Sequence, residues 1–408
     1  MKWIPLGIAL ASLVLISAGT TDSPRISASV PPELQPFVGG NLEFAADLLP
    51  KLQARDGNLA LSPYSLAAVL AVAQAGAMGQ TASEITAACH FPASQTQLAT
   101  SVSRVRSQLD AICKSGSVQL NSATGLWAQK DYGFEESFLK LARETHGAEI
   151  QTVDYVRSTG TVLNQINAWI KKNTRGKITG GIPASSVTPD TRLVVANAIY
   201  FKGQWASRFD RNATRNRPFH ISASASVDVP MMKQEHNFLY AERDGVQLLV
   251  LPYVGQSLHM LVLLPKQGGL TELEGQLNAG YLESWTSKVG LCKVDVLLPR
   301  FSIVSSHSLV KPLQSLGMQD AFDAGRADFS GMSRRRPLFI QTAEQTCLVE
   351  VNEEGTVAAA ATHTSFGCAA TIEPEHVTFH ADRPFLFLIR ENNTGMVLFV
   401  GRVANPAS

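Results

Sequence analysis

The amino-acid sequence predicts a single large domain of the α+β class. Helical patterns dominate its first part and short apolar strand patterns its later part, so many strands must pair with partners far away in the chain. No internal repeat and no Gly- or Ser-rich linker divides the chain. A length of 408 residues alone would suggest two or three domains, but nothing in the sequence supports a cut.

The first helices are predicted by the spacing of their apolar residues. This spacing indicates one helix within residues 44–52 and another around residues 166–170. Ser62 and Pro63 are typical of an N-cap followed by Pro at the first helical position. The apolar stripe that follows them ends at Gly76.

The strands are predicted by short runs rich in β-branched and aromatic residues. These runs lie at residues 193–201, 258–264, 294–301, 385–389 and 396–400. The last two flank the sequence Glu-Asn-Asn-Thr-Gly, which is a signal for a hairpin turn.

The composition excludes a disordered chain and argues against a nucleic-acid partner. Hydrophobic residues make up 45% of the chain and charged residues 17%, a balance typical of globular proteins. The 35 Lys and Arg residues and 34 Asp and Glu residues give a formal net charge of +1. The chain therefore lacks the broad positive field by which proteins attract nucleic acids.

The N-terminus has the pattern of a targeting segment. Lys2 precedes an apolar run over residues 4–16, which is too short for a membrane span of about 20 residues. With the small residues after it, this pattern predicts a secretory signal peptide over residues 1–19. We expect a flexible tail at residues 20–36, a folded domain at residues 37–408, no membrane partner, and secretion into the extracellular space or a periplasm.

No motif marks an enzyme active site, and we expect neither a metal nor a cofactor. The G-x-S-x-G, P-loop and H-E-x-x-H motifs are absent. The cysteines include no C-x-x-C pair and suggest no zinc site. They leave at least one thiol unpaired, and the sequence leaves open whether the first two form a disulfide: Cys89, Cys113, Cys292, Cys347 and Cys368.

Three further patterns resemble a binding or modification site, but each also has a simpler structural explanation. His376 and His380 share one face of a strand, but no third metal ligand is evident and a solvated face is simpler. The three arginines at residues 334–336 allow weak polyanion binding, or form a solvated loop. Asn212 and Asn392 begin glycosylation patterns, the second of which is better explained by the hairpin turn.

The most unusual segment begins at Glu353 and contains four consecutive alanines. Alanine favours helix, but strand patterns flank the segment at residues 348–351 and 377–379. About two dozen residues between them have little to bury, and a connection this long in a compact domain is usually functional or disordered.

A series of motifs occurs in one order along the chain, and together they are specific. On these motifs the chain resembles the serpins, the serine protease inhibitor superfamily, from about Asn41 to Pro406. The motifs are Asn58, Ser62, Pro63, Ser65, Leu70, Gly76 and Thr81; residues 197–205 with Phe209, Thr214 and Phe219; and residues 229–232, 297–301, 316–318, 327–332, 351–362, 383–387 and 401–403.

The resemblance implies a serpin domain with three β-sheets, eight or nine helices and an exposed reactive-centre loop at about residues 353–376. It also implies a suicide-substrate mechanism. A serine protease attacks the loop and forms an acyl-enzyme, and the cleaved loop then inserts into the central sheet as an additional strand. The resulting distortion of the protease stops deacylation.

The hinge implied by the resemblance suits insertion. Alternate side chains of an inserted strand face the interior, and from Thr356 onward this face carries only small uncharged residues. A buried charge there would cost several kcal/mol. Gly355 supplies a flexible pivot, and we expect Glu353 to pair with Arg300. The hinge residues are Glu353, Glu354, Gly355, Thr356, Val357, Ala358, Ala359, Ala360, Ala361 and Thr362.

The reactive bond can be placed by counting from either end of the loop. The spacing usual in serpins, counted from Gly355, implies Ala369 as the residue before the bond, whereas counting back from Pro374 by the same resemblance implies Ala370, before Thr371. Alanine suits elastase-like or subtilisin-like serine proteases and has no charge for a trypsin-like pocket that carries Asp.

The resemblance also assigns a sheet-opening region, in which one residue departs from the family pattern. Many serpins have His where this chain has Gln345. Glutamine can donate and accept hydrogen bonds, but it cannot titrate, so we expect less pH sensitivity of sheet opening at that position. The region comprises Ser62, Ser65, Asn197, Trp205, Arg300 and Gln345.

These observations favour a monomeric secreted protease inhibitor. The alternative is a non-inhibitory serpin that acts as a carrier or chaperone-like binder, and the small hinge residues argue against it. Phe366 would suit a chymotrypsin-like protease, but it lies three or four residues before the expected bond.

Overall fold

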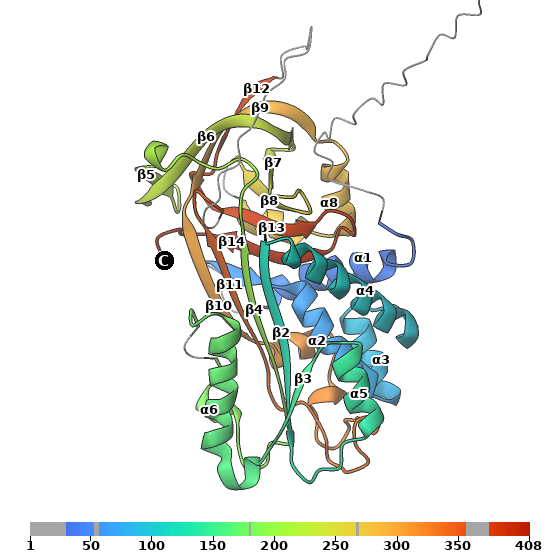
Figure 1. The fold of residues 1–408 in the computed structure, drawn as a ribbon. Coiled ribbons are helices and arrows are strands. Elements are labelled where there is room, and N and C mark those ends of the chain that lie inside the picture. The colour runs from blue at the N-terminus through green and yellow to red at the C-terminus, as the bar shows by residue number, and fades with distance from the viewer. Residues whose placement is uncertain (1–29, 53–56, 117, 179–180, 267–268, 356–374) are drawn as a thin grey trace, which may run out of the picture.

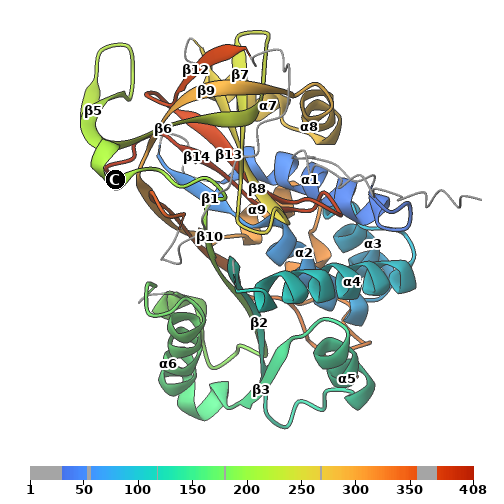
Figure 2. The same ribbon diagram turned by 45° about the horizontal axis from the view of Figure 1, so that its top comes forward.

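The computed structural model describes residues 30–52, 57–116, 118–178, 181–266, 269–355 and 375–408. Two hydrogen-bonded sheets form the body of this part of the chain, and helices cover them (Figures 1 and 2). The α+β class predicted from the sequence is confirmed. Among these residues, no helix combines the length and the apolar content that crossing a membrane requires.

Nine α-helices lie within the described residues, in agreement with the eight or nine expected. The start of α2 follows from its sequence, since Ser62 Oγ accepts a hydrogen bond from the N–H of Ser65 at 3.3 Å and Pro63 occupies the first turn. The helices are α1 (Gln35–Leu48), α2 (Pro63–Gly76), α3 (Gly79–Ala88), α4 (Gln95–Lys114), α5 (Glu136–Glu144), α6 (Tyr155–Asn173), α7 (Leu270–Gln276), α8 (Ala279–Thr286) and α9 (Val310–Ser315).

The folded domain begins before residue 37. Leu34 and Phe37 are each 1% exposed, and α1 starts at Gln35. The end of the expected tail at residue 36 is therefore too late, because Leu34 already contributes an apolar side chain to the core. The expected signal peptide lies outside the described residues.

The five-stranded sheet has the strand order β10-β11-β4-β2-β3. Its strands β4 and β11 run parallel, and we call their contact the seam; Val195 lies opposite Ala343 and Phe201 opposite Val349. β2 pairs antiparallel with β4, and β10 pairs antiparallel with β11. The strands are β2 (Val118–Gln129), β3 (Glu149–Val153), β4 (Leu193–Gly203), β10 (Phe301–Ser308) and β11 (Ala343–Val351).

Both faces of the five-stranded sheet are covered. Val194 and Ala198 of β4 pack in the cluster that contains α6, whereas Val195 and Ile199 pack in the larger core with α2. Figure 1 shows α6 standing beside these strands, apart from the other helices. A strand buried on both faces needs a nearly continuous apolar run, which explains why β4 lacks alternating polar residues.

The second sheet has nine strands, in the order β1-β14-β13-β8-β7-β6-β9-β12 with β5 paired to β6. The resemblance implies three sheets, but β6 and β9 are long enough to continue from one expected sheet into the next, so hydrogen bonds join two of them. The strands are β1 (Leu59–Leu61), β5 (Arg215–His220), β6 (Ser226–Arg243), β7 (Val246–Pro252), β8 (Leu258–Pro265), β9 (Gly290–Pro299), β12 (His376–His380), β13 (Phe385–Glu391) and β14 (Val397–Val403).

Each strand run predicted from the sequence corresponds to a strand. The run at residues 294–301 is divided at Arg300, since β9 ends at Pro299 and β10 begins at Phe301. β13 and β14 pair antiparallel around the expected turn at residues 391–395.

Candidate functional site

Polar side chains meet beneath the middle of the seam. Gln345 of β11 lies opposite Asn197 of β4, and its Nε2 donates a hydrogen bond to Asn197 Oδ1 at 3.2 Å. Gln345 also donates to the carbonyl oxygen of Ser62 at 3.0 Å and accepts from the N–H of Ser62 at 2.9 Å. Asn197 Oδ1 accepts a second hydrogen bond from Ser65 Oγ at 2.7 Å.

We call Ser62, Ser65, Asn197 and Gln345 the mid-sheet network. Each of these side chains is exposed by no more than 2%. The network ties both strands of the seam to the first turn of α2, and Ser122 of β2 extends it because its hydroxyl lies 2.9 Å from that of Ser65. Leaving one such buried group without a partner costs about 1–3 kcal/mol, so the network opposes separation of β4 from β11.

A titratable group lies next to Gln345 in β11. Burial raises the pKa of the Glu344 carboxyl to about 7, and a hydrogen bond with Ser308 opposes this shift only in part. The pKa of Glu344 thus falls near neutral pH. Many serpins have His at the next position, where this chain has Gln345. Even without that histidine, the start of β11 keeps a pH-sensitive group, the carboxyl of Glu344.

A second cluster lies where the chain leaves the end of β11. The carboxylate of Glu353 accepts hydrogen bonds from Arg300 Nε at 2.7 Å and from Thr214 Oγ1 at 2.5 Å. Its side chain is only 4% exposed and forms an ion pair with Arg300. Burial alone would raise the pKa of Glu353, but the hydrogen bonds from Arg300 and Thr214 outweigh burial and lower it. Glu353 is therefore held as a carboxylate.

Backbone hydrogen bonds hold the chain on either side of Glu353. The N–H of Phe209 donates to the carbonyl of Glu353 at 3.0 Å, and the N–H of Trp205 donates to the carbonyl of Glu354 at 3.1 Å. The indole Nε1 of Trp205 donates to the carbonyl of Asn352 at 2.9 Å. We call Trp205, Thr214, Arg300 and Glu353 the upper cluster.

Gly355 ends the described part of the hinge in a conformation that suits glycine. Its φ is +72°, and a Cβ built there would lie 2.3 Å from the carbonyl oxygen of Gly203 and 2.4 Å from the nitrogen of Trp205. The ring of Trp205 is itself held against Tyr253, with ring centroids 4.6 Å apart and planes 11° from parallel. The pivot therefore packs against the backbone of Gly203 and Trp205, next to this pair of stacked rings.

The predicted sheet-opening residues thus form two groups rather than one. Sequence reasoning named Thr214 only as a motif residue and missed Ser122 and Tyr253, because a hydroxyl or a ring in the sequence carries no signal of its partner. The hinge from Thr356 to Thr362 and the reactive-bond residues lie outside the described residues: Ala369, Ala370 and Thr371.

Comparison with known proteins decides the family. The family model described as "Serpin (serine protease inhibitor)" matches residues 39–406. The chain belongs to the serpin family. Serpins of this kind are inhibitors of serine proteases and not enzymes.

Individual relatives match the serpin over most of its length. Leukocyte elastase inhibitor of Homo sapiens is 37% identical over 389 residues, which cover 91% of this chain and 100% of the relative. An uncharacterized serpin-like protein of Thermococcus kodakarensis is 37% identical over 91% of this chain and 86% of its own. The solved structure of a tumour suppressing serpin superposes with a TM-score of 0.82 at 28% identity, covering 91% of this chain and 100% of that one.

The two histidines of β12 in this serpin face separate carboxylates. His376 Nε2 lies 3.3 Å from Glu235, and His380 Nε2 lies 3.7 Å from Asp295. Among the residues that the structure describes, no three His, Cys, Asp or Glu side chains are grouped to hold a metal ion. The two side chains thus approach carboxylates of two different strands, β6 and β9, and do not converge on one site.

Two of the three consecutive arginines form ion pairs. Arg334 lies 3.1 Å from Glu135, and Arg336 lies 2.8 Å from Asp328. Much of the positive charge of this run is therefore compensated locally.

The cysteines and glycosylation patterns are also placed. Cys89 and Cys113 are free thiols, as are the other two described cysteines, and Cys368 lies outside the described residues. Asn212 is exposed, whereas the side chain of Asn392 donates to the backbone carbonyl of Gln256, between β7 and β8.

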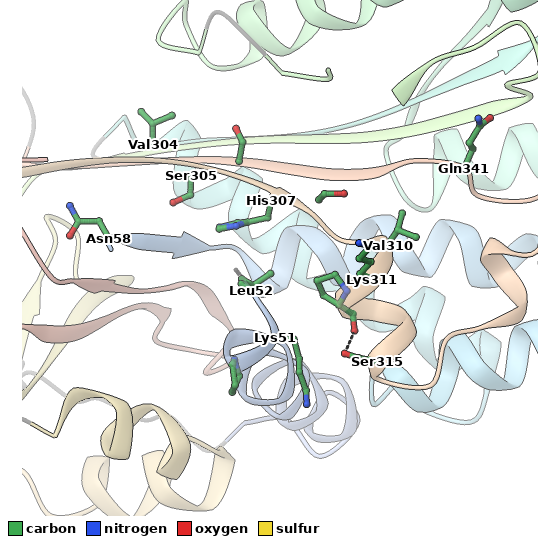
Figure 3. Close-up of a pocket in the computed structure, with 14 residues that line it drawn as sticks. Lys51, Leu52, Asn58, Val304, Ser305, His307, Val310, Lys311, Ser315 and Gln341 are labelled. Atoms are coloured by element: carbon green, nitrogen blue, oxygen red, sulfur yellow. Dashed lines mark hydrogen bonds between the residues drawn. The ribbon is translucent and has the colours of Figure 1, made fainter. Parts of the chain in front are cut away.

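A cavity of about 1000 Å³ runs along β10, the strand that pairs with β11 (Figure 3). Lys51, Val304, His307 and Lys311 contribute to its lining. No residue of the mid-sheet network or the upper cluster lines it, so it is not part of the sheet-opening site.

Proposed function

We propose that this serpin inhibits serine proteases by inserting its cleaved reactive-centre loop between β4 and β11. The observation that supports this is the parallel seam. The chain leaves the end of β11 through Glu353 and Gly355, so a segment that folds back there runs antiparallel to both strands. Insertion replaces one parallel pair of strands by two antiparallel pairs. Because parallel pairing is slightly less stable per residue, this exchange favours the inserted state.

The chemical steps follow ordinary acyl transfer. The serine oxygen of the protease adds to the carbonyl carbon of Ala369 or Ala370, and the peptide bond to the next residue breaks. The new amine leaves with a proton, and an ester joins the loop to the protease. Insertion of the hinge from Thr356 onward then carries the ester-linked protease away before water hydrolyses the ester.

The upper cluster defines where insertion starts. Glu353 is pinned by Arg300 and Thr214, whereas Gly355 has the conformational freedom of glycine. We infer that the chain before Gly355 stays in place and that Thr356 is the first residue to enter the seam.

Proteases that prefer small residues are the proposed targets. Alanine at position 369 or 370 fits a shallow specificity pocket. The name of the human relative, leukocyte elastase inhibitor, favours an elastase-like target, and a subtilisin-like protease meets the same requirement.

Incubation with a panel of serine proteases tests the proposal. We expect an SDS-stable complex with an elastase-like or subtilisin-like enzyme and none with trypsin. Mass spectrometry of the released C-terminal fragment should place the cut after Ala369 or Ala370. Cleavage without any stable complex contradicts inhibition, and a cut outside residues 367–371 contradicts the assignment of the bond.

The carrier or chaperone-like alternative makes a different thermal prediction. A loop that inserts after cleavage raises the melting temperature strongly, whereas a static loop leaves it unchanged. Scans before and after cleavage by a non-target protease therefore separate the two functions.

Secretion and a monomeric state complete the proposal. Residues 1–19 have the composition of a signal peptide, and N-terminal sequencing of the mature protein tests their removal. Polyanion binding at residues 334–336 is expected to be weak, because Arg334 and Arg336 already pair with acidic residues.

A further inference from the structure

A cavity of about 260 Å³ lies behind the sheet, between α2, α4, β2 and the turn after α5. Arg106, Asp110, Ser122 and His146 contribute polar groups to its lining, and Leu109 contributes an apolar side chain. The cavity is therefore bounded by both charged and apolar surface, which suits a small organic ion better than a hydrocarbon.

His146 is the unusual group in this cavity. It is 5% exposed, and neither ring nitrogen has a hydrogen-bond partner among the described residues. Burial and the charge of Arg106 lower its pKa to about 4, so at neutral pH one nitrogen donates and the other accepts. Buried polar groups are normally satisfied by protein, water or ligand.

The charges beside His146 define what such a ligand carries. Arg106 Nη2 donates to the backbone carbonyl of Glu144 at 3.0 Å, and no ion pair joins Arg106 to a carboxylate of the described residues. A single anionic group can therefore bind both the guanidinium and the neutral imidazole. Asp110 follows one turn later in α4 and lines the same cavity, and its repulsion of an anion grows with each negative charge on the ligand, so a single charge is favoured over several.

The cavity is connected to the seam by hydrogen bonds. Ser122 lines the cavity and its hydroxyl contacts that of Ser65 at 2.9 Å. Ser65 donates to Asn197, which accepts from Gln345 across the seam. Because residues of both α2 and β2 line the cavity, movement of β2 relative to α2 alters it.

We propose that this cavity binds a small monocarboxylate with an apolar body, held by Arg106 and His146, and that binding favours the closed seam. A ligand shifts an equilibrium only by its difference in affinity for the two states, and this cavity belongs to the closed state. Binding of the ligand to the cavity does not depend on the proposed function, whereas the effect of the ligand on loop insertion rests on it.

Calorimetric titration with benzoate tests the binding on the full protein. Benzylamine, which has the same ring and the opposite charge, and inorganic phosphate, which has no apolar body, are the comparisons. We expect saturable binding of benzoate alone. Arg106→Met and His146→Phe each preserve much of the side-chain volume and should weaken binding by about tenfold or more, whereas Lys311→Ala in the other cavity should not.

Alkylation of cysteines locates the ligand independently of any variant. Cys113 lines the cavity and Cys292 does not, although both are partly exposed. We expect benzoate to slow iodoacetamide labelling of Cys113, read by peptide mass spectrometry, and to leave Cys292 unchanged. If the cavity holds only water, benzoate does not bind saturably, and the proposal is overturned. Equal binding of benzylamine, or undiminished benzoate binding by both variants, also overturns the proposed site.

The effect on the seam is measured separately. We expect saturating benzoate to slow formation of the SDS-stable complex several-fold in the wild type and not in His146→Phe. An unchanged rate with bound benzoate contradicts the coupling. Failure to form any complex refutes the proposed function instead, since titration and labelling remain readable without a protease.

Discussion

Gln345 and Asn197 lie opposite each other in parallel strands, and the 3.2 Å hydrogen bond between them crosses the contact that the proposed insertion would open. Gln345 also forms two hydrogen bonds with the backbone of Ser62 at the start of α2. One side chain thus joins both sides of the seam and the helix beneath it.

Gln345→Ala should weaken the closed sheet. Truncation leaves the N–H and carbonyl of Ser62 without these partners, and we expect a loss of about 2–4 kcal/mol. The measurement is the midpoint of the first transition in urea, with Gln345→His as the matched variant because imidazole also donates and accepts. A midpoint unchanged in the alanine variant would mean that the network does not stabilise the seam.

Stability should decrease as the pH rises through neutrality. Burial raises the pKa of Glu344 to about 7 in the folded protein, so the protonated form is favoured by folding. Its contribution is complete below the unfolded pKa, near 4.3, and is lost as pH rises through 7, by at most about 4 kcal/mol. Urea midpoints between pH 5 and 8 check this, and Glu344→Gln should flatten the profile. If the urea midpoint of that variant depends on pH as steeply as the wild type does, another titratable group causes the pH dependence.

Gly355→Ala should disturb the pivot. A Cβ there meets the carbonyl oxygen of Gly203 at 2.3 Å, whereas Gly245 has a similar positive φ with nothing within 4 Å. Gly245→Ala therefore controls for backbone strain alone. We expect the Gly355 variant to give a lower fraction of SDS-stable complex and more cleaved serpin, and equal yields from both variants would exclude the steric explanation.

Thr356→Arg should convert the inhibitor into a substrate. The side chain belongs to the face that insertion buries, and an unpaired charge costs several kcal/mol to desolvate. Val357→Arg places the same charge on the opposite face and should affect the yield much less. Densitometry of complex against cleaved product distinguishes them, and a wild-type yield from Thr356→Arg contradicts insertion.

Local signals predicted local structure well. The cap at Ser62, the end of α2 at Gly76 and the division of strands by turns all follow from residues within a few positions of the feature. The ordered motifs also named residues on both strands of the seam, although their grouping into a mid-sheet network and an upper cluster depends on their spacing along the strands.

Contacts between distant segments were not predictable in the same way. The Ser65–Ser122 hydrogen bond depends on how α2 rests on β2, and the shifted pKa of Glu344 depends on burial by its surroundings. The burial of Leu34, which shortens the expected tail, also needs the whole core. Each of these features is a property of packing, which has no signature in a single segment.

The position of Trp205 gives the hinge an intrinsic optical label. Its indole N–H donates to the carbonyl of Asn352 at 2.9 Å and its ring stacks on Tyr253. Indole emission depends on hydrogen bonding and on neighbouring groups, so the proposed entry of Thr356 into the seam, next to Gly355 and Trp205, should alter the fluorescence of one of five tryptophans. Stopped-flow emission therefore times the first movement of the loop without any attached dye.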